Sequence, residues 1–311
     1  MATTSVRTGN LPSTDGFVDV NLLDGGSFIA DLSRLHAGEN GKFRMYNWAF
    51  HISHQGRHIL WDLGLDEDRN CYTPWVNKFM LAEINHVGPR RTVVQQLSER
   101  GVQAQDIDTV IFSHAHWDHS RPISNVFPNA VAHFGPGTRD ACSPGHLEDA
   151  NAQWDGRFFD PNKSTEKWSE LSGHWQDFGP FDKALDFFGD GSFWVFQSPG
   201  HMPGNLSAAA RLQSGHWALL GSDCCHSREL LDGKQEIAIF GGTMSLHSDL
   251  EAARNTIAKI RTLEKDHGFH VALAHDASWM KDGKDNVLMS LLDDYMRTAV
   301  AEGRIARDEI P

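Results

Sequence analysis

Four groups able to bind a metal ion are concentrated in one short run of the sequence, Ser113-His114-Ala115-His116-Trp117-Asp118-His119. Neutral imidazole and carboxylate suit Zn²⁺ and comparable first-row divalent metals. One ion rarely takes four ligands from so short a segment without strain. We therefore expect two ions, with His114 and His116 on one and Asp118 and His119 on the other. The alternative is a group of structural histidines without a metal.

Further ligands are expected where other apolar runs end. His201 lies in a loop shaped by glycine and proline, residues 198–204, and Asp223 and His275 each follow an apolar run. Functional groups collect at the carboxyl ends of strands in layered α/β folds. We therefore expect these three side chains to converge on the histidine run, where the two oxygens of Asp223 could bridge two ions.

The elements that must position these residues alternate between strands and helices. Apolar, β-branched and aromatic runs predict strands over 43–53, 58–63, 108–112, 130–134, 193–196, 206–212, 216–220 and 269–274. Helical spacing predicts helices over 92–100 and 285–302. A third helix is predicted to begin at Ser248, with Glu251 completing a capping box, and to end at Gly268.

Domain organisation follows from the same pattern. Residues 1–16 are polar and are expected to form a flexible leader, and 17–311 are expected to form a single domain. Within it, about 135–192 is polar, punctuated by glycine and proline, and rich in aromatic residues that include Trp154. Long segments of this kind are usually functional, so we expect an aromatic insert or lid there.

Composition limits the classes of function. The chain has 311 residues, with 28 Lys+Arg against 41 Asp+Glu and a formal net charge of −13. This balance argues against nucleic-acid binding through phosphate contacts. It does not exclude a small-molecule substrate, which we expect, because metal ions can make a site locally cationic. No apolar run is long enough for a transmembrane helix, and no apolar signal core is visible near residue 1. With only four cysteines, we expect a cytoplasmic protein without a disulfide scaffold.

The order of these motifs resembles that of the metallo-β-lactamase superfamily. The shared pattern is HxHxDH, a Pro-Gly-His loop, an aspartate after a strand and a late histidine. Asp62 in Trp61-Asp62-Leu63-Gly64 also resembles the family's early Asp-x-Gly element, whose aspartate usually has a structural or supporting role. The resemblance implies an α/β fold, a four-layer αββα sandwich with its site at one edge. It also implies a full set of ligands. The first metal would be held by His114, His116 and His201, the second by Asp118, His119 and His275, and Asp223 would bridge them.

The resemblance, together with a site for two divalent ions, implies a hydrolase. Zn²⁺ is the default from the ligand types, and Fe, Mn or Co fit the same set. A hydroxide generated on the metals would attack a carbonyl carbon, and Asp118 is placed to shuttle a proton to the leaving group. The branch of N-acyl homoserine lactonases, which open a cyclic ester, is the most similar. That branch commonly has a tyrosine three residues after the bridging aspartate, where it contacts the substrate carbonyl. This chain has His226 there, which we expect to be catalytic. It could donate the same hydrogen bond, or it could indicate another substrate.

The sequence also allows other interpretations of the function and of several residues. Trp117, Phe79, Trp154 and His226 are the expected substrate contacts, although core packing is an alternative for Phe79. The Trp-rich form also resembles fungal hydrolases that open lactams or cyclic carbamates such as benzoxazolinone, and acyl thioesterases. A di-iron redox enzyme is a further alternative, but little of the chain remains for a flavin module. The 285–302 helix could pack on the sandwich or form a homodimer interface.

Overall fold

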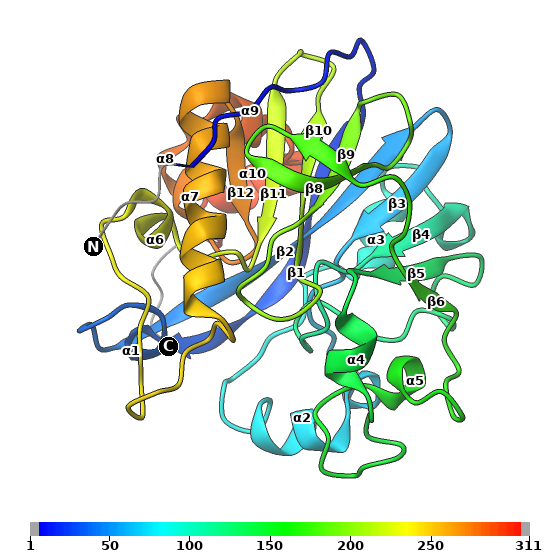
Figure 1. The fold of residues 1–311 in the computed structure, drawn as a ribbon. Coiled ribbons are helices and arrows are strands. Elements are labelled where there is room, and N and C mark those ends of the chain that lie inside the picture. Colours follow the sequence, from blue (N-terminus) through cyan, green and yellow to red (C-terminus); the bar gives the residue numbers. More distant parts are fainter. Residues whose placement is uncertain (1–5, 306–311) are drawn as a thin grey trace.

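Two six-stranded sheets lie face to face in the computed structural model, which describes residues 6–305 (Figure 1). Residues 1–5 of the expected leader and 306–311 at the end of the expected domain lie outside the described residues. The strands of the first sheet are β1 Asp19–Asp31, β2 Lys42–His54, β3 Arg57–Trp61, β4 Ile107–Ile111, β5 Val131–Phe134 and β6 Trp168–Glu170. Those of the second are β7 Gln176–Phe178, β8 Phe181–Asp186, β9 Phe193–Gln197, β10 Leu206–Arg211, β11 Trp217–Ser222 and β12 His270–Leu273.

Helices fill the connections between the strands. The α-helices are α1 Leu32–Leu35, α2 Pro74–Phe79, α3 Val93–Ser98, α4 Thr138–Cys142, α5 Gly156–Phe159, α6 Arg228–Asp232, α7 Leu250–His267, α8 Ser278–Asp282, α9 Asn286–Ser290 and α10 Asp294–Ala301. Two short 3₁₀ helices span Arg69–Cys71 and Ala104–Asp106. No helix among residues 6–305 combines the length and the apolar character that a bilayer crossing requires.

Each sheet mixes antiparallel and parallel pairing. The first runs in the order β1-β2-β3-β4-β5-β6, antiparallel from β1 to β3 and parallel from β3 to β6. The second runs in the order β12-β11-β10-β9-β8-β7 and is antiparallel except where β11 pairs with β12. Strands β4, β9, β11 and β12 end at loops that lead to the candidate ligands.

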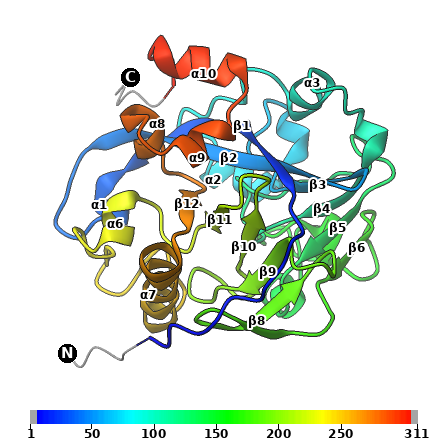
Figure 2. The same cartoon turned by 90° about the horizontal axis from the view of Figure 1, so that it is seen from above.

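Alternating side chains divide the interior into three apolar layers. In β9, Phe193 and Val195 face the central layer between the sheets, whereas Trp194 and Phe196 face the outer layer beneath α7. The outer face of the first sheet packs on α3 and α5. Helices α8, α9 and α10 close the central layer along one side, and Figure 2 shows them opposite α7. The order of layers is therefore helix, sheet, sheet, helix, which confirms the α/β sandwich.

The predicted strands are all present, and β1, β6, β7 and β8 are additional to them. Strand β1 was not predicted, because its run is broken by Asp24 and two glycines where its register with β2 shifts. The predicted 285–302 helix is two helices, since Asp285 caps α9 and Asp293 starts a new turn by capping α10. Asp249, rather than Ser248, caps α7 by accepting a hydrogen bond from the amide of Ala252.

The aromatic 135–192 segment has two different environments. Strand β6 extends the first sheet and β7 and β8 extend the second, so this part is built into the sandwich. The connection between α4 and α5 instead passes beside the candidate site, where Trp154 lies over His116. Residues 6–16 form neither helix nor strand, and they contact the domain through an ion pair of Arg7 with Asp177.

Candidate metal centre

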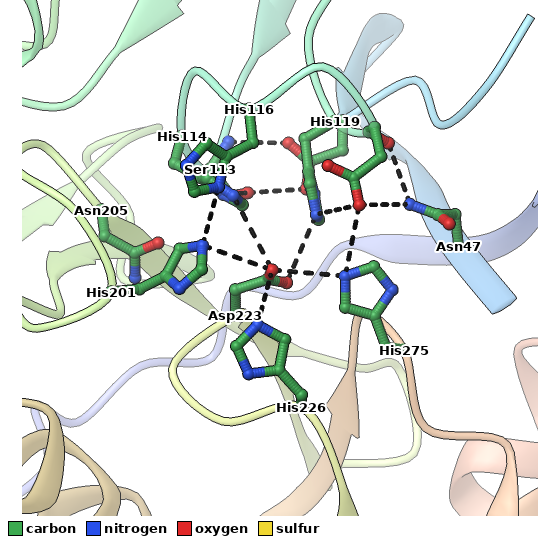
Figure 3. Close-up of polar contacts among 12 residues, drawn as sticks. Asn47, Ser113, His114, His116, His119, His201, Asn205, Asp223, His226 and His275 are labelled. Carbon is green, nitrogen blue, oxygen red and sulfur yellow. Dashed lines mark hydrogen bonds and ion pairs between the residues drawn. The ribbon is translucent and has the colours of Figure 1, made fainter. Parts of the chain in front are cut away.

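The seven predicted ligands come together at one edge of the sandwich. The loop after β4 carries His114, His116, Asp118 and His119, and the loops after β9, β11 and β12 carry His201, Asp223 and His275, respectively. All except His116 are nearly or fully buried. Four separate strand ends therefore converge on one point (Figure 3).

Asp223 lies at the centre of the cluster. Its Oδ2 is 3.2 Å from His275 Nε2, 3.5 Å from His201 Nε2 and 3.8 Å from His114 Nε2. Its Oδ1 is 3.3 Å from His119 Nε2. One carboxylate thus faces both halves of the histidine set, which is the arrangement that a bridging ligand requires (Figure 3).

Four sets of three residues present ligand atoms within 4.8 Å of one another. These sets are His114–His116–His201, His114–His119–Asp223, Asp118–His119–His275 and His201–Asp223–His226. Within them, four buried polar atoms lack a hydrogen-bond partner. One is His201 Nδ1, and the three that face the other ligands are His114 Nε2, His119 Nε2 and Asp223 Oδ1. Buried polar atoms are rarely left unpaired, because desolvation without a partner is costly. Ligation by divalent cations would satisfy the three atoms that face the other ligands, so the donor set fits a metal centre.

Neighbouring groups fix the orientation of the ligand rings. Asp62 accepts hydrogen bonds from the amide and hydroxyl of Ser113, at 2.7 and 2.8 Å, and from His119 Nδ1 at 2.9 Å. His275 Nδ1 donates to the backbone carbonyl of Tyr46 at 2.7 Å. In both histidines the proton is therefore on Nδ1, and Nε2 is directed into the cluster as a potential ligand. The role of Asp62 agrees with the supporting one implied by its Asp-Leu-Gly motif.

Two residues that support the ligands were not identified by the sequence analysis. Asn47 of β2 donates from Nδ2 to the backbone carbonyl and to Oδ2 of Asp118, at 3.0 and 3.3 Å. Arg121 is buried, and its Nη1 donates to the consecutive carbonyls of residues 63–65. Both contacts connect segments more than 50 residues apart and belong to no local motif, so spacing alone gave no signal for them.

The electrostatics separate the histidines into two kinds. Burial lowers the pKa of His116 to about 4 and holds the pKa of His114 and His201 well below the usual value. Burial also opposes protonation of His119, but the carboxylates of Asp223, Asp118 and Asp62 outweigh it and raise the pKa well above normal. The first three rings are therefore neutral at pH 7 and ready to bind a cation, whereas His119 must release a proton first.

The comparison with known families agrees with this geometry. A model of the metallo-beta-lactamase superfamily matches residues 44–266, a range that includes every candidate ligand except His275. The chain belongs to the metallo-beta-lactamase superfamily. This membership confirms the resemblance that the ligand motifs carried.

Several relatives in this superfamily carry informative names. "Cytochrome P450 monooxygenase mpaDE'" of Penicillium brevicompactum is 27% identical over 92% of this chain, which spans only 36% of the relative's length. "Gamma-lactamase MBL2" of Gibberella moniliformis is 34% identical over 54% of this chain and 70% of its own length. "N-acyl homoserine lactonase AttM" of Agrobacterium fabrum is 30% identical over 59% of this chain and 63% of its own length.

A solved structure supports the fold. An N-acyl homoserine lactone hydrolase with the product N-hexanoyl-L-homoserine bound has a TM-score of 0.64 to this structure and is 18% identical. The match covers 86% of this chain and 97% of that one. At this identity, the likeness concerns the superfamily fold.

His226, which we predicted to contact the substrate, lies directly beside the candidate ligands. Its Nε2 is 3.2 Å from Asp223 Oδ2, and its ring is stacked parallel to that of His275. Next to it is His247, which was not predicted. His247 is only 4% exposed, and both of its ring nitrogens lack a hydrogen-bond partner. Its ring packs against those of His226 and His201, so two further histidines adjoin the seven predicted ligands.

The predicted aromatic contacts form one face of the site. The rings of Trp154 and His116 are nearly parallel, with centroids 5.8 Å apart, and both residues line a small pocket with Trp117. Phe79 does not line this pocket. It is 54% exposed and contacts Trp75 at the end of α2. Trp117 and Trp154 thus lie beside the ligands, and Phe79 lies apart from them.

A larger cavity opens on the other side of the cluster. We call it the β2–α8 chamber. It has a volume of about 440 Å³, and its wall includes Leu35, Arg44, Tyr46, His226, His275 and Ser278. His226 and His275 form the part of its wall that meets the candidate metal ligands. The cluster is therefore accessible from two sides, and the roomier side is the one that sequence motifs did not indicate.

Proposed function

We propose that the chain is a two-metal hydrolase that opens a cyclic ester. The observation that carries the proposal is the set of buried, unpartnered ligand atoms around Asp223. In this arrangement His114, His116 and His201 would hold one divalent cation, and Asp118, His119 and His275 a second. Asp223 would be shared, and Zn²⁺ is the ion that the imidazole and carboxylate donors favour.

The chain's own residues would then divide the work. When bound, divalent metal ions supply Lewis acidity and lower the pKa of coordinated water. Asp118 is held by Asn47 and is placed to accept a proton and pass it to the departing alcohol oxygen. His226 faces the β2–α8 chamber and can donate a hydrogen bond to the substrate carbonyl. No serine or cysteine nucleophile is needed, and Cys224 and Cys225 are buried beneath α6 and α7.

A cyclic ester is preferred to the other acyl substrates on two grounds. The superfamily relatives include a named lactonase and a named γ-lactamase, so ring opening is common to both. An ester also has a better leaving group than an amide, so its opening demands less of a single proton donor. The γ-lactamase relative makes a lactam or cyclic carbamate the second candidate.

Proton release in a pH-stat tests the proposal, because each ester ring that opens liberates one acid. The purified protein, loaded with Zn²⁺ and its metal content measured, is given neutral lactones of varied side chain. We expect rapid release that a chelator abolishes and added Zn²⁺ restores. Silence with two metals bound would refute the lactonase proposal, and lactams and thioesters would then be assayed with the same preparation.

A further inference from the structure

The β2–α8 chamber has one wall that connects the metal ligands to an arginine. Lys42, Arg44 and Tyr46 are alternate residues of β2, and all three line the chamber. The carbonyl of Tyr46 holds His275, so this end of the wall is fixed at the candidate metal centre. Residues two apart in a strand are separated by about 7 Å. Arg44 therefore lies roughly one aromatic ring farther from the ligands than Tyr46 does.

Arg44 is available to bind an anion. It is half-buried, and the only hydrogen bond that its side chain makes within residues 6–305 goes from Nη1 to the hydroxyl of Ser27, at 3.1 Å. No carboxylate of the described chain forms an ion pair with it, although the net charge is −13. Most other arginines in comparable half-buried positions have such a partner, as Arg228 does in Glu264.

The chamber wall has three acidic residues, Glu39, Glu229 and Asp276, and none of them pairs with Arg44 within residues 6–305. Two of the three are engaged by other groups. Glu39 is engaged by His36 Nδ1 at 3.0 Å and by Gln235, and Asp276 accepts a hydrogen bond from the hydroxyl of Ser278 at 2.8 Å. The ring of Tyr46 supplies aromatic surface between Arg44 and the ligands, and Phe43 adds apolar surface to the wall on the far side of Arg44. The chamber thus combines a metal-ligand end, an aromatic wall and a guanidinium.

We propose that the chamber selects aryl substrates that carry a carboxylate about one ring away from the scissile carbonyl, and that Arg44 binds this carboxylate. The planar guanidinium matches a carboxylate in two parallel hydrogen bonds, a geometry that lysine does not offer. The inference rests on the proposed function in one respect, that the substrate carbonyl is placed at the metal centre. It adds the substrate class, which neither the fold nor the ligand set determines.

A binding experiment tests the proposal without relying on turnover. The probe is terephthalate, whose two carboxylates are separated by one ring, and the comparison is 4-methylbenzoate, in which an uncharged methyl group replaces the second carboxylate. Isothermal titration calorimetry on the Zn²⁺-loaded protein measures both dissociation constants. We expect the wild type to prefer terephthalate by about tenfold or more, as a charge-assisted hydrogen bond implies. Arg44→Gln is expected to reduce the preference to about one, and Arg44→Lys to leave an intermediate value.

A matched control keeps the result specific. Arg34→Gln removes the same charge from α1, where the guanidinium lies over the ring of Phe240 and does not line the chamber. This variant is expected to retain the wild-type preference. The proposal is overturned if the wild type binds both probes equally, if it binds neither, or if Arg44→Gln and Arg44→Lys both keep the full preference. A protein that shows the preference but opens no lactone would refute the proposed function and leave the carboxylate site intact.

Discussion

The metal centre and the β2–α8 chamber border the same point but are built in different ways. The centre is assembled from loops that follow four strands, and its rings are nearly all buried and held by neighbours such as Asp62. The chamber is lined by one strand and by residues around α1, α6 and α8, and several of its side chains are half-exposed. Buried, mutually fixed groups suit chemistry that tolerates little displacement. Half-exposed groups can be exchanged at little cost to stability, which suits the selection of substrates.

The largest effect is expected when a ligand of the metal centre is removed. Asp118→Ala is expected to reduce lactone opening at least about a thousandfold, since it removes both a metal ligand and the proposed proton carrier. Metal analysis should find one ion per chain instead of two, with an unchanged circular dichroism spectrum. Asp140→Ala, on the exposed surface of α4, is the control. Full activity of Asp118→Ala would end the two-metal proposal.

A smaller effect is expected from a residue that only orients the ligands. Asp62→Asn keeps the shape of the side chain, and asparagine tolerates the left-handed backbone of this position, where φ is 59°. It loses the charge that holds Ser113 and His119. Zn²⁺ affinity should fall about 10- to 100-fold, as measured by competition with a chromophoric chelator. An unchanged affinity would mean that the ring of His119 is oriented by packing alone.

A third prediction concerns the burial of His51, which lies in β2 away from the β2–α8 chamber. Burial, with a smaller contribution from His58, lowers the pKa of His51 to about 4. The unfolded chain binds this proton near pH 6.5 and the folded chain does not, so stability is lost as the pH falls from 6.5 toward 4. We expect His51 to cost about 2 kcal/mol between pH 7.5 and pH 5. Urea unfolding of the wild type and His51→Phe should show the gap between them shift by this amount, and a constant gap would contradict the assignment.

The smallest effect is expected at Phe79, which lies outside both the metal centre and the β2–α8 chamber. Because the side chain is exposed and lines neither cavity, Phe79→Ala should change stability by less than about 0.5 kcal/mol. Lactone kinetics should stay within about twofold. A large rise in KM with long-chain lactones would instead restore Phe79 as a substrate contact, with α2 moving toward the site.

The sequence predicted the metal centre well because its signals are local. A buried run followed at once by His114, His116 and Asp118 places ligands at a strand end, and the same rule found His201 and His275. Each of these side chains is positioned by the strand immediately before it. The sandwich fold followed from the resemblance that those motifs carry.

The chamber and the supporting residues could not be predicted in the same way. Arg44 and Asn47 are ordinary members of a long strand, and their importance depends on segments far away in the sequence. His247 follows no strand, and its loop is held in place because the amides of Ser248 and Asp249 donate to carbonyls of the His201 loop. Such contacts exist only after the two sheets have packed. The break in the 285–302 helix was missed for a related reason, since two aspartate caps compete with helical periodicity.

The position of α9 and α10 has a consequence for synthesis on the ribosome. Leu288, Met296 and Ala299 belong to the apolar layer between the sheets, together with Phe193 and Val195 of β9. Translation proceeds at about 5–20 residues per second, so the strands are made seconds before these helices emerge. During that interval the apolar layer between the sheets is exposed on the side that α9 and α10 later occupy. The nascent chain would then need protection from aggregation until residues near 300 have left the exit tunnel.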